Sequence, residues 1–237
     1  YHTFYHPHNM MLFVVGNIQP EELMDVIKEN QNKKHFLPET SIQRKKIEEP
    51  ESVAVKEQID IMQVEMNKLI VSIKVNDIMT NPQEKIKREL SFNLLFDLYF
   101  SKSSVLYNEW LSKGYINETF SANFTQERDY AFILIGGDQD DYHLLQKTIF
   151  DFIEHIDDLV IEQEDFERIK RKTIGNFINS YNSPESIANS FSRYYFEGIC
   201  SFELVDYVSK ITIADLNEVK KYFNKEYAST YIVKKDK

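Results

Sequence analysis

The sequence predicts an α+β fold in which an antiparallel sheet is flanked by helices. Glycine and proline number only six each among 237 residues, which favours long regular elements over a loop-rich chain. Hydrophobic residues make up 42% and aromatic residues 14%, enough for a sizeable core. Strand-like segments do not alternate strictly with helical ones, and this arrangement favours hairpins and an antiparallel sheet.

The first predicted unit is a strand followed by a helix. Residues 10–15 (MMLFVV) form a continuous apolar run that ends at Gly16, a pattern typical of a strand buried on both faces. Pro20 then opens a helix at a position where its missing N–H costs nothing, and Glu21 and Glu22 favour the positive end of the helix dipole.

A linker is predicted after this helix. Between residues 30 and 57 the periodicity is lost, and Pro38 and Pro50 enclose a highly charged stretch. We therefore expect residues 1–45 to hold the end of a first domain and the start of the linker, residues 46–61 to be linker, and residues 62–237 to form the second domain. A long solvated loop within one domain is the alternative.

The second domain is predicted from start and stop signals along the chain. Pro at the first turn, Ser, Thr or Asn before it and Gly after it mark the helices, whereas β-rich runs mark the strands. Gly136-Gly137 is interpreted as the turn that ends a hairpin. The predicted strands are 68–75, 120–124, 130–135 and 228–233, and the predicted helices are 82–100, 103–112, 141–156, 162–181, 184–198 and 212–224.

Charge and cysteine content narrow the class of protein. The formal charge of −10 repels phosphate backbones, so we expect no nucleic-acid partner, although a basic peptide would be attracted. Cys200 is the only cysteine, which excludes an internal disulfide and fits a cytoplasmic protein. No apolar run reaches the ~18 residues of a membrane span, so we expect no membrane partner. Because the chain begins with Tyr1, we expect a longer parent.

Few residues suggest chemistry of their own. His2, His6 and His8 are close in sequence, but Pro7 prevents a helix that would align them, and no carboxylate lies nearby to complete a ligand set. We therefore predict no metal ligand and no catalytic residue in this chain. Arg193 and Tyr194 are a candidate substrate-binding pair, with helix packing, in which the arginine stem covers aromatic surface, as the alternative.

Two segments resemble pitrilysin/insulinase-type zinc metalloproteases, the group that includes mitochondrial processing peptidase. Residues 4–23 (FYHPHNMMLFVVGNIQPEEL) resemble the segment that closes the first domain of these proteins. Residues 103–124 (SSVLYNEWLSKGYINETFSANF) resemble a helix, glycine and hairpin of their second domain. The order and separation of the two segments also fit.

The resemblance implies a metallohydrolase-like half of a clamshell protease. Zinc would be bound upstream of this fragment, on the parent's own N-terminal domain, by a His-x-x-Glu-His motif that these 237 residues lack. We thus expect the C-terminal, non-metal-binding half of a zinc endopeptidase, which walls the chamber where a peptide is cut and is inactive alone. A catalytically silent core-type scaffold subunit of the same family is the alternative, and an unrelated α+β interaction module is a third.

The chain departs from the family at two positions. Many relatives carry an Arg in the short helix and a Tyr after the glycine, and both reach the substrate; here these positions hold Leu111 and Asn117. Leucine has no hydrogen-bond donor and asparagine is short and uncharged. The resemblance therefore implies a homologous partner subunit that provides the missing side chains, or a silent family member.

Overall fold

The computed structural model describes residues 3–38, 41–45 and 48–236. The chain divides into two compact units, one made of Tyr1–Glu49 with Phe177–Glu203, the other of Pro50–Asn176 with Leu204–Lys237. The predicted domain limits stay a prediction, because a division into compact units does not test where the family's first domain ends and its second begins.

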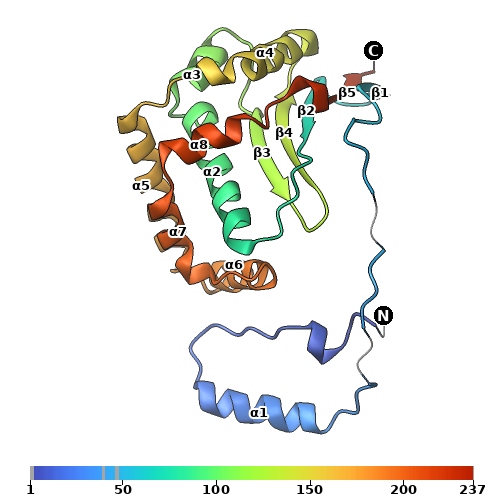
Figure 1. Cartoon of the computed structure of the whole chain (residues 1–237), viewed down its shortest axis with the longest axis vertical. Coiled ribbons are helices and arrows are strands. Elements are labelled where there is room, and N and C mark those ends of the chain that lie inside the picture. The colour runs from blue at the N-terminus through green and yellow to red at the C-terminus, as the bar shows by residue number, and fades with distance from the viewer. Residues whose placement is uncertain (1–2, 39–40, 46–47, 237) are drawn as a thin grey trace. The chain divides into compact units, whose positions relative to one another are not determined.

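The larger unit is built on a five-stranded sheet (Figure 1). Its strands follow the order β1-β5-β2-β4-β3, with β1 parallel to β5 and every other pair antiparallel. The α+β prediction is confirmed, but the sheet is mixed rather than purely antiparallel. The strands are β1 (Glu57–Met62), β2 (Lys68–Lys74), β3 (Ser121–Gln126), β4 (Ala131–Asp138) and β5 (Ala228–Lys235).

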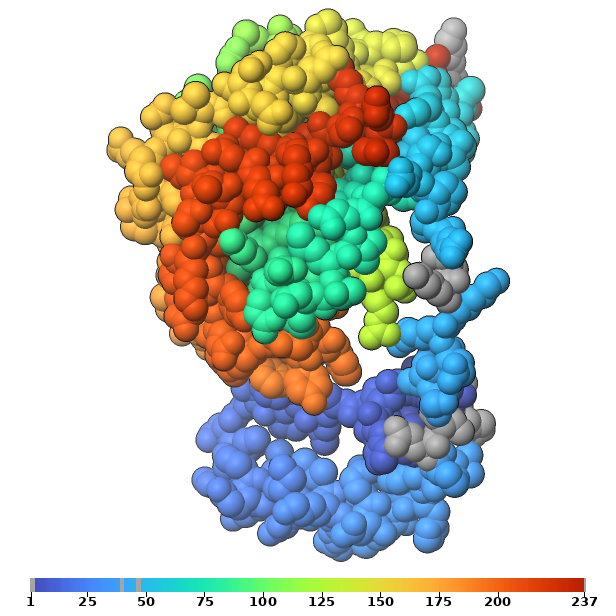
Figure 2. Space-filling model, in the orientation of Figure 1, coloured from blue at the N-terminus to red at the C-terminus, as the bar shows by residue number. Residues whose placement is uncertain are grey.

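Helices cover one face of this sheet. The structure assigns α2 (Pro82–Phe100), α3 (Val105–Ser112), α4 (Tyr142–His155), α5 (Gln163–Ser180), α7 (Leu204–Lys210) and α8 (Ile213–Lys220). In Figure 2, α8 (red) lies against α2 (green), in agreement with their contacts. The predicted helices are present, and α7 was missed because its seven residues carry too short a pattern to read.

The core lies between the sheet and these helices. Leu69, Val71 and Ile73 of β2 are fully buried on the covered face, and Ile133 of β4 pairs with Ile73 on the same face. On the helix side, the Phe92 ring of α2 stacks on Phe124 of β3 with centroids 4.0 Å apart. Alternate residues therefore point to opposite faces, as the period of a strand requires.

Gly136 and Gly137 lie inside β4, so the predicted turn at this pair is wrong. A Cβ on Gly136 would stand 2.1 Å from the carbonyl oxygen of Leu69, and one on Gly137 would stand 2.9 Å from the Cα of Phe120. The glycines are needed because the backbone of neighbouring segments approaches them closely, not because the chain reverses.

Charged side chains hold both ends of α8. Asp215 accepts hydrogen bonds from the N–H and hydroxyl of Thr212 (2.8 Å each) and pairs with Lys87 (2.6 Å). Burial opposes ionisation of Asp215, but these bonds outweigh it and lower its pKa. At the other end, buried Lys220 donates to the carbonyl of Leu159 (2.6 Å), and desolvation lowers its pKa.

The smaller unit contains two longer helices, α1 (Pro20–Asn32) and α6 (Pro184–Phe196), and the 3-10 turns η1 (Pro7–Asn9) and η3 (Ser201–Glu203). The α1 prediction is confirmed, whereas the strand predicted at residues 10–15 is wrong: the structure assigns no strand there. A strand requires a neighbour to accept its backbone hydrogen bonds. None of the strands assigned within residues 3–38, 41–45 and 48–236 pairs with this segment.

The stretch predicted as a linker ends in a strand. Among its described residues, positions 33–56 contain no helix or strand, but β1 begins at Glu57, within the predicted linker 46–61. The six residues EQIDIM alternate between polar and apolar side chains over too short a stretch to be recognised among charged residues. The backbone of β1 instead pairs with distant β5.

Candidate functional site

Arg193 and Tyr194 lie near the C-terminal end of α6 in the smaller unit. The Arg193 guanidinium is 5.2 Å from the centroid of the Tyr194 ring, and Tyr194 is buried whereas Arg193 is exposed. This geometry is that of an arginine covering an aromatic ring. Contact of this pair with substrate stays a prediction.

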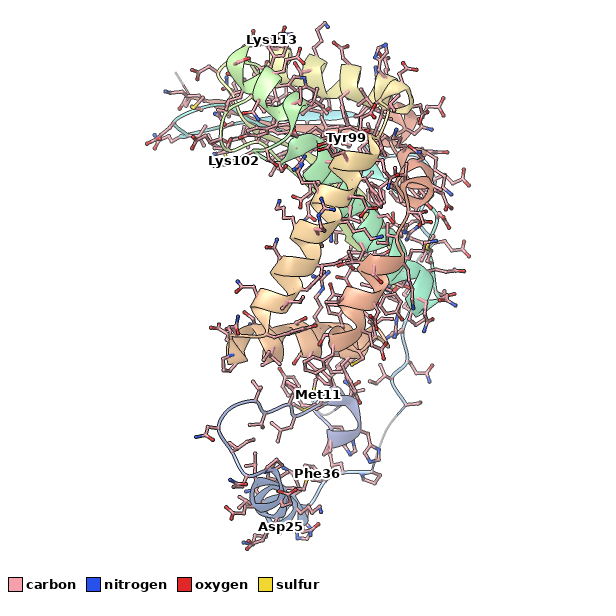
Figure 3. The ribbon with its side chains drawn as sticks, turned by 90° about the vertical axis from the view of Figure 1, so that its left-hand side faces the viewer. Met11, Asp25, Phe36, Tyr99, Lys102 and Lys113 are labelled. Carbon is pink, nitrogen blue, oxygen red and sulfur yellow. The ribbon has the colours of Figure 1, made fainter. Side chains whose placement is uncertain are left out.

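Leu111 and Asn117 lie in the larger unit, on either side of the turn that joins α3 to β3. Ser104 caps α3 by accepting a hydrogen bond from the N–H of Tyr107 (3.0 Å), and Gly114 ends it with a φ of +69°. Leu111 is on the exposed side of the last helical turn. Lys113, which follows α3, marks this end of the helix in Figure 3.

Asn117 is used to hold its own loop. Its Oδ1 accepts hydrogen bonds from the N–H (2.9 Å) and the hydroxyl (2.7 Å) of Thr119. An asparagine that stabilises a turn in this way is a common local motif. Asn117 therefore stabilises the turn here, and it lacks the long phenolic side chain of a tyrosine.

The loop is also tied to the end of β4. Thr119 accepts a hydrogen bond from the N–H of Asp138 (2.7 Å), and the Gln139 side chain donates to the carbonyls of Gly114 (2.9 Å) and Tyr115 (3.2 Å). We call residues 111–120 the α3–β3 surface. These hydrogen bonds fix the loop, which leads into β3, a strand at the edge of the sheet. No local signal in the sequence points to Gln139, because its partners lie 24 and 25 residues away.

The described residues do not fit a zinc site. Within residues 3–38, 41–45 and 48–236 there is no group of three His, Cys, Asp or Glu side chains that could hold a metal ion. One ring nitrogen of His6 lies 2.9 Å from the carbonyl of Leu37, and the other accepts from the N–H of His8 (3.3 Å). His2, part of the considered cluster, lies outside the described residues.

A buried arginine, missed by sequence reasoning, joins α2, β3 and the segment after β2. Arg88 donates to Oε1 of Gln126 from Nε (3.1 Å) and Nη2 (2.9 Å), and to the carbonyl of Asp77 from Nη1 (2.7 Å). Tyr222 donates to the Asp77 carboxylate (2.5 Å); burial and this bond raise the pKa of Tyr222. With its donors directed at protein acceptors, Arg88 is a structural residue.

The second face of the sheet is less covered than the first. Ile70 and Tyr231 are partly exposed there, and the Tyr231 hydroxyl donates to Asp60 of β1 (2.6 Å). That hydrogen bond raises the pKa of Tyr231. Sequence reasoning missed this pair because it did not anticipate β1.

No helix among the described residues is long and apolar enough to cross a bilayer.

Comparison with known proteins gives one consistent result. A family model described as the peptidase M16 inactive domain matches residues 1–173. The uncharacterised zinc protease YmfH of Bacillus subtilis is 40% identical over 219 residues, which are 92% of this chain and 51% of that protein. Zinc protease PqqE of Helicobacter pylori is 24% identical over 242 residues, covering 97% of this chain and 52% of PqqE.

Solved structures show the same fold. The structure of an M16-like peptidase from Alicyclobacillus acidocaldarius superposes with a TM-score of 0.86 at 22% identity, covering 93% of this chain and 53% of that one. The chain thus spans about half the length of the relatives it matches.

Proposed function

The chain belongs to the peptidase M16 family and matches its inactive domain, and we propose that it is the non-metal-binding half of a zinc-dependent endopeptidase. The match over residues 1–173 is the observation that carries the proposal. In this role the chain forms a wall of the chamber in which an extended peptide is cut, facing the parent's own N-terminal, zinc-bearing domain.

The α3–β3 surface is the part of the wall that we assign to the peptide. Its loop is held by Thr119 and Gln139, so it offers a surface of defined shape. It leads into β3, an edge strand of the five-stranded sheet. An extended peptide needs partners for its own N–H and C=O groups, and a strand edge offers them.

The zinc of the other half would supply an activated water and polarise the scissile carbonyl. This chain brings neither a guanidinium to the family's Arg position nor a phenol to its Tyr position, since Leu111 is apolar and Asn117 is an amide bonded to Thr119. Each donor missing from a developing oxyanion typically costs about 2.7–4 kcal/mol of transition-state stabilisation. We therefore propose that the active enzyme is a heterodimer whose homologous partner subunit provides both side chains.

The test uses the full-length parent with its zinc-bearing domain and a quenched fluorescent peptide. Leu111→Arg should raise kcat/KM when the parent is assayed without a partner, because it returns a donor to the wall. Val105→Arg is the matched control: it lies on the same helix, is 83% exposed, and is six residues away and hence on another side of α3. Equal kcat/KM for both variants and the unmodified parent would argue against a peptide-facing α3–β3 surface.

The heterodimer has its own test. The parent alone should cleave slowly, and addition of a homologue that carries the Arg and Tyr should restore turnover. Full turnover by a lone parent would remove the need for a partner.

A catalytically silent scaffold subunit is the second candidate, favoured by the same two positions, Leu111 and Asn117. It predicts a parent with no zinc, and metal analysis of the full-length protein separates the two.

As part of the leading proposal we place the enzyme in the cytoplasm, supported by the single cysteine, Cys200. Cell fractionation checks this location.

A further inference from the structure

Strand β1 forms one end of the five-stranded sheet, and β5 is its only neighbour among the described strands (Figure 1). The N–H of Thr230 in β5 donates to the carbonyl of Lys56, just before β1 (2.9 Å). Along a parallel ladder, alternate residues direct their backbone groups to the same neighbour. The N–H and C=O groups of Glu57, Ile59 and Ile61 therefore point away from β5, along the free edge of the sheet.

The same edge carries exposed apolar side chains. Ile59 lies beside Ile232 of β5, which is fully buried, so Ile59 and Ile61 project to the helix-covered face of the sheet. They are nevertheless 45% and 68% exposed. β1 also contains neither proline nor lysine, two residues that commonly protect a free edge. An edge strand of this kind is suited to pairing with another strand.

We propose that β1 pairs with β1 of a second copy of this chain, antiparallel and two-fold symmetric about Ile59, so that the two sheets become continuous. In a two-fold interface the contacts are reciprocal. Centring the axis on Ile59 places this residue opposite its own copy and Glu57 opposite Ile61. Every outward N–H and C=O of these three residues then has a partner, and the four isoleucines meet on one face.

The polar side chains on the other face favour the same register. Gln58 falls opposite Asp60 of the second copy, and Lys56 lies diagonal to that carboxylate, within reach of a long side chain. Within one copy, Asp60 accepts from Tyr231 (2.6 Å) and Gln58 (3.3 Å), but both bonds end on Oδ2, so Oδ1 is available to a further donor. Lys56 is exposed and would exchange its bond to the carbonyl of Glu226 for this ion pair.

The neighbouring registers are worse. An axis centred on Asp60 would place the two Asp60 carboxylates opposite each other, and an axis centred on Ile61 would place Glu57 opposite Glu65, beyond the end of the strand. Like charges directly opposite each other destabilise a pair of strands. The charges along β1 therefore select one alignment of the two copies.

This inference does not depend on the proposed function. β1 and β3 are opposite edges of the sheet, so pairing through β1 leaves the α3–β3 surface open. The formal charge of −10 on each copy opposes association, but physiological salt screens such repulsion beyond about 8 Å.

Disulfide trapping in the full-length parent tests the register. Cys200, which is exposed and free, and any cysteine of the zinc-bearing half are first replaced by serine. Ile59→Cys then places two thiols on Cα atoms about 5.5 Å apart, within disulfide reach, so mild oxidation with diamide should give a covalent dimer. Ile61→Cys is the matched control: it lies on the same face and is more exposed, but the two copies of this position are separated by roughly 13 Å along the strand, so it should not cross-link.

Sedimentation velocity over a range of concentrations measures association without cross-linking. The unmodified parent should dimerise, and Ile59→Lys should weaken the dimer by about tenfold or more, because two like charges then meet at the two-fold axis. Val160→Lys, at a 77% exposed position between α4 and α5, should leave the dimer unchanged.

The outcomes separate this inference from the proposed function. A parent that stays monomeric, or that cross-links equally well through Ile59→Cys and Ile61→Cys, would overturn the inference, as would a dimer that is unaffected by Ile59→Lys. A monomeric parent that binds zinc and cleaves peptide would still leave the proposed function standing. A parent that dimerises through β1 but binds no zinc would support the inference while the proposed function fails.

Discussion

Replacing Arg88 by methionine tests the buried network at the start of α2. Arg88 is 4% exposed and donates four hydrogen bonds, two to Gln126, one to the carbonyl of Asp77 and one to the hydroxyl of Tyr222. It also forms an ion pair with the Asp77 carboxylate (3.6 Å). Methionine keeps an apolar stem of similar length, so the loss is that of the guanidinium, whose carbon lies 5.5 Å from the centroid of the Phe124 ring. Truncating one partner of a buried charged pair costs about 3–5 kcal/mol.

The expected loss lies at the lower end of that range. The Asp77 side chain is 52% exposed, so water can solvate its carboxylate once Arg88 is gone. The side-chain oxygen of Gln126 and the carbonyl oxygen of Asp77 each lose their hydrogen-bond donor in a partly buried site. We therefore expect Arg88→Met to reduce the free energy of unfolding by about 3 kcal/mol.

The assay is urea unfolding followed by tryptophan fluorescence. Trp110 is the only tryptophan and is buried against Phe100 and Phe120, so it reports on the core of the larger unit. With a urea m-value of about 2–3 kcal/mol/M, the midpoint should fall by roughly 1 M. The matched control, Lys68→Met, removes an exposed ion pair with Asp138 and should cost less than about 1 kcal/mol.

Two results would refute this reasoning. The first is that Arg88→Met unfolds at the same urea concentration as Lys68→Met. The second is that Arg88→Lys is as stable as the unmodified chain. The second result matters because lysine keeps the charge but cannot form the fork that reaches both Gln126 and Asp77.

Three further predictions concern single positions. Gly136→Ala should destabilise the sheet severely, since its Cβ would lie 2.1 Å from a backbone oxygen. Gly175→Ala in α5 has open space around its Cβ and should stabilise the chain by about 0.5–1 kcal/mol. Thermal unfolding of the two variants tests both expectations. Asp215→Asn should be less stable than the unmodified chain at neutral pH, and the gap should close as the pH falls below about 4, because a lowered folded pKa gives stability that is lost on protonation. The unmodified chain should gain stability as the pH rises from the lowered pKa of Lys220 towards its usual value of about 10.4, since the unfolded chain then binds more protons. Lys220→Met should lack that gain in urea unfolding at pH 7 and pH 10, and an unchanged pH dependence would count against it.

The elements that sequence reasoning located well depend on local interactions. Asn81 accepts hydrogen bonds from the N–H groups two and three residues ahead, and Ser104 and Ser183 each accept one from three residues ahead. Such caps act within one turn, so the pattern along the chain contains the whole interaction. The helix starts at positions 82, 105 and 184 follow from it.

The elements that sequence reasoning missed depend on partners far along the chain. β1 is a strand because Glu57–Met62 lies beside β5, more than 170 residues later. Gly136 is required by the backbone of Leu69, and nothing within the hairpin distinguishes that requirement from a turn. The same limit applies to the candidate site. Resemblance located Leu111 and Asn117, but the bond from Asn117 to its own loop and the support from Gln139 appear only in three dimensions.

Residues 10–15 show the opposite case, in which the sequence pattern requires an environment that the described part of the chain does not provide. Their apolar pattern predicts burial on both faces, yet Leu12 is 68% exposed and no strand among the described residues pairs with the segment. An apolar strand in water has no energetic reason to persist, because its side chains gain nothing from exposure and its backbone groups need partners. The stack of Phe13 on Phe191 holds only one side. The strand prediction therefore failed because no strand among the described residues pairs with residues 10–15.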